Sequence, residues 1–250
     1  MNVAVVIPTY NEKETLPSLI EKLFENLKLI VDELHIVIVD DSSPDGTADM
    51  ARSLGEKFQK ISVIQKPGKM GLGAAYKDGF SHVLQNLNSD LIVQMDADHS
   101  HNPSEITSMI DKISDYDYVV ASRHIQGSSI VGWGVGRRFI HSTAGAIARI
   151  STKIDIDDST SGFRMFKRET LERIEFDDIS SDGFAFQIEV LYQLKQKGMR
   201  GLEVPTTFVN RTEGKSKMGS AEILQFAKMC LSYIGTVSYT HLTLPTILLV

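Results

Sequence analysis

The sequence predicts an α/β fold, in which a mainly parallel sheet is flanked by helices within a single domain. Two observations support this prediction. Apolar strand-like runs alternate with helical patterns, and each run ends in a polar segment; the runs are residues 3–7, 35–39, 61–64, 91–95 and 117–121. Such alternation is typical of right-handed βαβ units, which bind ligands beyond the carboxyl ends of their strands.

Helical patterns with apolar stripes lie between these strands. They cover about residues 11–27, 46–57, 71–87 and 103–113. Beyond residue 123 the alternation weakens. We expect helices there at about 137–151, 183–197 and 221–234, and one strand at 202–209.

Capping residues set the expected starts of two helices. Asn11, with Glu14 three residues later, suits the first helix. Before the helix at 103–113, Asn102 is the expected N-cap and Pro103 the first helical residue. Glu105 then completes a capping box.

Composition excludes several classes of protein. The net charge of −6 gives no reason to expect a nucleic-acid-binding protein. No run of about 18 apolar residues predicts a membrane-spanning helix, and the N-terminus lacks the features of a signal peptide. The single cysteine, Cys230, excludes an intrachain disulfide and fits a reducing compartment.

Polar segments follow every predicted strand. They are residues 8–12, 40–47, 66–73, 96–98 and 122–124. Tyr10 can stack on a base, while Glu12 and Asp41 can accept hydrogen bonds from a base or a ribose. The segment 71–73, Gly-Leu-Gly, lacks the features of a P-loop and of the full dinucleotide fingerprint, so both of those folds are disfavoured.

Asp96 and Asp98 follow the fourth predicted strand and are candidate metal ligands. Residues two apart in a strand point the same way, so both carboxylates face one crevice if the extended geometry continues. Mg²⁺ and Mn²⁺ prefer such oxygen ligands and commonly share them with phosphates. Taken alone, the pair fits an acidic turn and solvated N-cap better than a metal site. Its place in a row of polar strand ends favours the metal site.

These motifs together resemble the family 2 glycosyltransferases of the GT-A (Rossmann-like) fold, and within them the polyprenyl-phosphate (dolichol-phosphate) mannosyltransferases. The matching positions are residues 8–12, 40–47, 71–73, 96–98, 122–123, 158–164, 183–189 and 214–217, with Trp133, Arg137 and Arg211. The resemblance implies a catalytic domain over residues 1–235. Residues 236–250 match nothing in the family and resemble a translated sequencing adapter, so we expect a non-native tail.

The resemblance implies a metal-dependent, inverting transfer of mannose from GDP-mannose to a polyprenyl (dolichyl) phosphate. The implied catalytic residues are Asp98, Arg123, Arg137, Arg211 and Lys217. The implied nucleotide-sugar site comprises Pro8, Tyr10, Glu12, Val39, Asp41, Lys69, Asp96, Ala97, Asp98, Arg123, Arg211 and Lys217. Mg²⁺ or Mn²⁺ would be held by Asp96, Asp98 and Ser100, although some members carry Gln at the Ser100 position.

Three alternatives remain open at this point. The donor can instead be UDP-glucose. Transfer to a carbohydrate hydroxyl would need a general base, for which Glu189 is a candidate, whereas a phosphate acceptor is already mostly a dianion at neutral pH and needs none. A non-catalytic nucleotide- or metal-sensing signalling module would use Asp40 and Asp41 but leaves the second half of the chain unexplained.

A polyprenyl phosphate acceptor lies in a membrane, so we expect peripheral association with the cytoplasmic face. The helices around residues 139–150 and 221–234 have apolar faces. These faces can lie in the membrane interface or pack on the protein's own core. The sequence leaves the oligomeric state open.

Overall fold

The computed structural model describes residues 1–210 and 226–233, and its fold is α/β as predicted. The first half contains β1 (Asn2–Thr9), α1 (Leu16–Leu27), β2 (Glu33–Asp40), α2 (Thr47–Phe58), β3 (Ile61–Gln65), α3 (Leu72–Asn86), β4 (Leu91–Gln94), α4 (Glu105–Lys112), η1 (Ile113–Asp115) and β5 (Tyr118–Ser122). The five strands and four helices predicted there are therefore confirmed, with small shifts in their bounds.

The second half is less regular. It contains β6 (Ser129–Val131), α5 (Val135–Thr152), β7 (Arg164–Lys167), α6 (Arg168–Leu171), η2 (Phe176–Asp178), α7 (Gly183–Gln196), β8 (Gly201–Pro205) and β9 (Thr207–Val209). Residues 226–233 are helical. Within the described ranges, no helix combines the length and the apolar character needed to cross a bilayer.

The main sheet has seven strands in the order β3-β2-β1-β4-β7-β5-β8. All neighbours pair in parallel except β7, which runs antiparallel to both β4 and β5. The mainly parallel sheet is thus confirmed, but β7 is absent from the predicted elements. Its first residue, Arg164, is fully buried. A buried arginine in so short a run hides the strand pattern.

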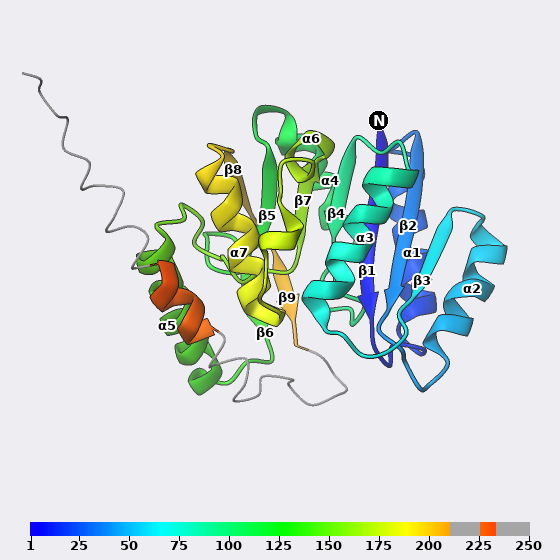
Figure 1. The fold of residues 1–250 in the computed structure, drawn as a ribbon. Coiled ribbons are helices and arrows are strands. Elements are labelled where there is room, and N and C mark those ends of the chain that lie inside the picture. Colours follow the sequence, from blue (N-terminus) through cyan, green and yellow to red (C-terminus); the bar gives the residue numbers. More distant parts are fainter. Residues whose placement is uncertain (211–225, 234–250) are drawn as a thin grey trace, which may run out of the picture.

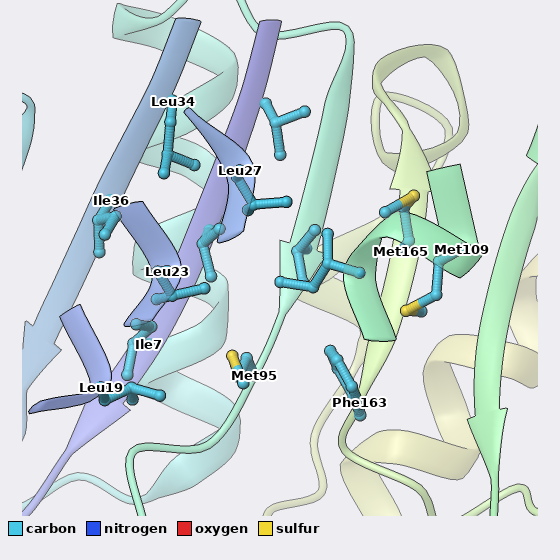
Figure 2. Packing of buried hydrophobic residues seen from close by; sticks show 14 of the residues in the cluster. Ile7, Leu19, Leu23, Leu27, Leu34, Ile36, Met95, Met109, Phe163 and Met165 are labelled. Atoms are coloured by element: carbon cyan, nitrogen blue, oxygen red, sulfur yellow. The ribbon is translucent and has the colours of Figure 1, made fainter. Parts of the chain in front are cut away.

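Helices cover both faces of this sheet (Figure 1). On one face α1 contributes most of the packing. Figure 2 shows Leu19, Leu23 and Leu27 of α1 against Ile7 of β1 and Ile36 of β2. On the other face α3 and α7 pack side by side, and α5 lies with residues 226–233 beyond β8 (Figure 1). Burial of each such leucine contributes roughly 1.5–3 kcal/mol to folding.

The predicted strand at 202–209 is wrong as a single element, because it splits at Pro205–Thr206. β8 continues the main sheet beside β5, whereas β9 pairs with β6 in a separate two-stranded sheet. Glu105 explains the break. Its carboxylate accepts hydrogen bonds from Thr206 Oγ1 (2.5 Å) and the Thr207 N–H (3.1 Å), which directs the chain away from the first sheet.

Both predicted capping arrangements are also wrong. α4 begins at Glu105, whose carboxylate is engaged by Thr206 and Thr207; Asn102 accepts the Ser104 N–H in a local turn. α1 begins at Leu16, and Asn11 adopts a left-handed conformation with φ of 60°. In both places the chain makes an extra turn before the helix begins, since the loop first completes contacts with other strand ends.

Candidate functional site

The carboxyl ends of β1, β2 and β3 form what we call the strand-end edge, defined by residues 8–12, 40–47 and 66–73. Because these strands are parallel, the loops that follow them meet at one side of the sheet. There Lys69 Nζ lies 3.9 Å from the centre of the Tyr10 ring. The Glu12 carboxylate accepts the Thr15 hydroxyl at 2.8 Å. The predicted nucleotide-binding residues Tyr10 and Lys69 are therefore in direct contact.

Asp41 and Asp40 have different partners in this edge. Asp41 is buried, and its two oxygens accept the N–H groups of Met70 (2.7 Å) and Gly71 (2.9 Å). It therefore holds the glycine-containing loop against the end of β2. Asp40 is completely buried and accepts hydrogen bonds from Thr9 and Ser43. These contacts give Asp40 a structural role.

Three predicted nucleotide-sugar residues offer little side chain to a ligand. Val39 is fully buried in the core beside α3, and Ala97 is buried in the core on the opposite face. Pro8 is partly buried within β1. Their contribution to a ligand site would therefore come mainly from the backbone that they place.

The acidic loop at residues 96–101 follows β4 and leaves the sheet at once. β4 ends at Gln94, so the argument that strand geometry aims Asp96 and Asp98 the same way does not hold. Oδ1 of Asp96 accepts the hydroxyl of Tyr76 at 3.0 Å, and its backbone N–H donates to His101 Nδ1 at 3.2 Å. Oδ1 of Asp98 accepts the Ser100 N–H at 3.0 Å.

His99 makes the turn between Asp98 and Ser100. Its φ of 59° lies in the left-handed region, and its Nε2 lies 2.8 Å from Ser18 Oγ on α1. A left-handed residue here lets the Ser100 N–H fold back onto the Asp98 carboxylate. The loop is thus fixed to α1 as well as to the sheet.

The acidic loop suits a hard divalent cation that brings most of its own ligands. Asp96 and Asp98 supply carboxylate oxygens, the donor type that Mg²⁺ and Mn²⁺ prefer. Within the described ranges, no group of three or more His, Cys, Asp or Glu side chains could hold a metal alone. A cation here would therefore complete its shell with phosphate oxygens and water, as Mg²⁺ commonly does.

Arg123, a predicted catalytic cation, forms a buried ion pair with Asp158. Its Nε and Nη2 each donate to the Asp158 carboxylate at 2.7 Å, and its backbone N–H adds a third bond. Burial alone would raise the pKa of Asp158, but the charge and hydrogen bonds of Arg123 outweigh it and hold that pKa well below its ordinary value. The charge of Arg123 is consequently balanced within the protein.

Aromatic rings surround this ion pair and bring a second arginine to it. Arg137 lies 4.5 Å from the centre of the Trp133 ring and donates to Asn210 Oδ1 at 2.9 Å. The Trp133 and Phe208 rings contact each other and both flank Arg123. We call Arg123, Trp133, Arg137, Asp158 and Phe208 the cation–aromatic cluster. Phe208 also contacts the ring of His101, so the cluster adjoins the acidic loop.

His141 connects the cluster to α5. Its Nε2 lies 2.9 Å from Thr160 Oγ1, and Arg123 donates to that same hydroxyl. Burial, and next the positive charge of Arg123, lower the pKa of His141 to about 4. His141 is therefore neutral near pH 7 and adds no charge to the cluster.

Residues 4–175 match the family described as Glycosyl transferase family 2. The chain belongs to this family. An undecaprenyl-phosphate mannosyltransferase from Micrococcus luteus is 37% identical over 218 residues, covering 87% of this chain and 88% of that protein. A polyprenol monophosphomannose synthase from Mycolicibacterium smegmatis is 36% identical over 221 residues, covering 88% of this chain and 82% of that protein.

The fold is shared with solved glycosyltransferases, which confirms the predicted GT-A architecture. The crystal structure of glucosyl-3-phosphoglycerate synthase from Mycobacterium tuberculosis with Mn²⁺, UDP-glucose and phosphoglyceric acid has a TM-score of 0.66. The two chains are 20% identical, and the match covers 94% of this chain and 80% of the other. Family membership makes this chain a glycosyltransferase, so the alternative of a non-catalytic signalling module is wrong.

Two residues expected in the site of this glycosyltransferase stay predictions, and a third has other partners. Arg211 and Lys217 lie outside the described residues, as does the tail at 236–250. Glu189, the candidate base for a hydroxyl acceptor, is buried, and its two oxygens accept the N–H and the hydroxyl of Ser181. That carboxylate is consequently engaged in holding the start of α7.

Tyr76, His101 and Phe208 are not among the predicted site residues of this glycosyltransferase, although all three adjoin the predicted ones. Tyr76 lies in the apolar stripe of α3 and resembles an ordinary core residue. Phe208 alternates as expected for a strand. Only His101 had a signal in the sequence, because it is a histidine three residues after Asp98. The structure shows that its side chain is buried.

Proposed function

We propose that this glycosyltransferase transfers mannose from GDP-mannose to a polyprenyl phosphate, giving an inverted, β-linked polyprenyl phosphate mannose. The observation that carries the proposal is the meeting of the acidic loop and the cation–aromatic cluster at Phe208. A donor diphosphate with its cation and an anionic acceptor need such neighbouring sites. The names of the two relatives with 36–37% identity support the same donor sugar and acceptor class.

The donor would lie along the strand-end edge with its diphosphate at the acidic loop. Tyr10, Lys69 and Glu12 would contact the nucleoside. Asp96, Asp98 and Ser100 would hold Mg²⁺ or Mn²⁺, which offsets the negative charge that grows on the departing diphosphate. Arg211 and Lys217 remain proposed members of the cation set around the phosphates.

The acceptor phosphate would bind near Arg137. A phosphate monoester has a second pKa of about 6, so at neutral pH it is mostly a dianion and can attack the anomeric carbon without a general base. Glu189, the candidate general base, is engaged by Ser181, which supports a phosphate acceptor over a neutral sugar hydroxyl. Arg137 suits the task because a planar guanidinium can bind two phosphate oxygens.

Peripheral association with the cytoplasmic face of a membrane is part of this proposal. α5 carries no acidic residue and exposes Val135 (85%), Ile140 (57%), Ile147 (45%) and Ile150 (76%). Leu231, on the neighbouring helical segment 226–233, is also exposed. Arginines beside an exposed apolar face are typical of helices that lie in the interface of an anionic membrane.

The lipid-transfer assay tests the proposal. Purified protein is incubated with radiolabelled GDP-mannose, Mn²⁺ and dolichyl or undecaprenyl phosphate, and label is measured in the organic phase. We expect labelled lipid, and none without Mn²⁺. No labelled lipid, with a working control enzyme alongside, would refute the proposal. A panel including UDP-glucose identifies the donor.

Asp98→Ala tests the metal assignment within the same assay. Loss of a carboxylate from the cation site should cost several kcal/mol of transition-state stabilisation, or about 100-fold or more in rate. Asp111→Ala, at an exposed position of α4, is the matched control and should retain activity. Equal activity of the Asp98→Ala variant and the wild type would contradict the metal assignment.

A further inference from the structure

We propose that Tyr76 and His101 are positioning residues that fix Asp96 for a divalent cation and diphosphate. The inference rests on the proposed function, because it assigns no new reaction. It concerns how the first carboxylate of the acidic loop keeps one orientation after the chain has left the sheet. Neither residue need contact the substrate.

Tyr76, on α3, fixes the carboxylate of Asp96 through its hydroxyl. Its ring is fully buried and lies against Phe80 (5.7 Å between ring centres) and Phe186 (6.0 Å). The hydroxyl donates to Asp96 Oδ1 at 3.0 Å. Because α3 and α7 hold the ring, this bond gives Oδ1 a fixed place, while Oδ2 lies 3.9 Å from His101 Nε2.

His101 fixes the backbone of Asp96. The Met95 N–H still bonds to Val6 in the neighbouring strand, but the next N–H, that of Asp96, donates to His101 Nδ1 at 3.2 Å. A buried N–H without a partner is costly, so this bond determines where the chain leaves the sheet. The imidazole is buried and stacks on Phe163 with 4.9 Å between ring centres.

Two anchors on one carboxylate residue are the arrangement that a weakly held cation needs. Residues 1–210 and 226–233 offer too few ligands to hold the ion alone, so affinity depends on how well each carboxylate is oriented beforehand. Loss of an outer partner of a ligand typically lowers metal affinity by about 10- to 100-fold. Removing the Tyr76 hydroxyl should therefore weaken cation binding without disturbing the fold.

The experiment measures Mn²⁺ binding directly, by electron paramagnetic resonance with GDP present and without a lipid acceptor. Tyr76→Phe keeps the ring between Phe80 and Phe186. We expect its dissociation constant for Mn²⁺ to rise about tenfold or more. At saturating Mn²⁺ the rate of lipid mannosylation should return close to that of the wild type. Tyr118→Phe is the control, because it alters another buried tyrosine that packs on Phe166.

His101 supplies a second, independent arm. His101→Phe keeps a ring against Phe163 but lacks an acceptor for the Asp96 N–H, and should weaken Mn²⁺ binding about tenfold. His101→Asn restores a side-chain acceptor and should recover part of the loss. A purely structural role would lower Tm in both variants equally and leave the Mn²⁺ affinity of the folded protein unchanged.

The outcomes separate this inference from the proposed function. Wild-type Mn²⁺ affinity in both Tyr76→Phe and His101→Phe would overturn the positioning role alone. Failure of the wild-type protein to bind Mn²⁺ with GDP would overturn the metal assignment, and this inference with it. Weakened binding in both variants, with partial recovery in His101→Asn, supports the positioning role.

Discussion

The strand-end edge and the cation–aromatic cluster both belong to the proposed site, yet they are stabilised by different physical means. At the strand-end edge, carboxylates are bound by neutral backbone donors. Asp41 accepts two N–H groups from the loop at 70–71, and Asp45 accepts those of Lys13 and Thr47. In the cluster, a carboxylate and a guanidinium are buried together and enclosed by rings.

The difference shows how each region can treat a charged ligand. Backbone donors orient a carboxylate without placing an opposite charge beside it. The two cations of the edge have other partners, because Lys66 pairs with Asp78 and Lys69 lies over the Tyr10 ring. In the cluster the buried pair cancels its own charge, and Trp133 holds the guanidinium of Arg137 at 4.5 Å. The ion pair with Asp158 engages the guanidinium of Arg123, so its catalytic role stays a prediction, and we take Arg137 as the first candidate for phosphate contact.

Breaking the buried pair should have the largest effect. Asp158→Asn leaves the charge of Arg123 buried without its partner and should lower the free energy of unfolding by about 3–5 kcal/mol. Urea denaturation measures the change. The control is Asp157→Asn, one residue earlier, which removes an exposed pair with Arg149 and should cost about 1 kcal/mol or less. Equal effects of the two substitutions would show that the Arg123 pair contributes little.

Arg137→Ala should separate the two regions functionally. A hydrogen bond to a charged group contributes about 1.5–3 kcal/mol, so the KM for polyprenyl phosphate should rise about 10- to 100-fold. Mn²⁺–GDP binding should be unchanged, because the substitution lies outside the strand-end edge. Arg52→Ala, which removes an exposed arginine of α2 that belongs to neither region, is the control. If Arg137→Ala weakened nucleotide binding instead, the assignment of the two regions would be reversed.

Gly71→Ala should damage the strand-end edge and spare the cluster. Gly71 has φ of 97°, and an added Cβ would overlap the Asp182 carboxylate, which accepts the Gly73 N–H. Backbone strain of this kind costs about 1–3 kcal/mol. Gly68→Ala, in the same loop, meets no atom within 4 Å and should be tolerated. Thermal unfolding and Mn²⁺–GDP titration compare the Gly71→Ala and Gly68→Ala variants. Similar results for both would show that the loop tolerates a side chain at Gly71.

His141→Gln should have the smallest effect, confined to acidic pH. The pKa of His141 is lowered from 6.5 to about 4, so between these values the unfolded chain binds more protons than the folded one. The free energy of unfolding therefore falls as pH drops through that window. Gln keeps a partner for Thr160, and Tm should become less dependent on pH between 4 and 6.5, with a change at pH 7 of about 1 kcal/mol or less. If Tm of the His141→Gln variant depended on pH as strongly as that of the wild type, His141 would be excluded as the cause of that dependence.

The sequence predicts the first half of this fold better than the second half. The first-half strands and their polar ends follow from local patterns, because each strand is a continuous apolar run. β7 could not be predicted this way, since its first residue, Arg164, is buried and donates hydrogen bonds to the carbonyls of Ser159 in the preceding loop and of Gln187 on α7. Likewise, nothing local marks Tyr76 as the partner of Asp96, 20 residues away.

The site residues show a further limit. Arg123 is recognisable as part of a motif, but the sequence does not say that Asp158 neutralises it. Asn102 and Glu105 match a capping box, yet Glu105 bonds instead to Thr206 and Thr207, about 100 positions later. A local motif predicts hydrogen bonds to residues nearby in the sequence, whereas Glu105 forms its hydrogen bonds with residues of a distant segment.

The antiparallel strand β7 has a consequence for the order in which the chain can fold during synthesis. β1 to β4 form four adjacent strands from the first 94 residues, so they can pair as soon as they are made. β5 is made next, but in the main sheet its neighbours are β7 and β8, which lie downstream. A nascent chain must therefore keep residues 118–122 and the open edge of β4 from mispairing until Arg164–Lys167 emerges, and that interval is the one in which we expect aggregation.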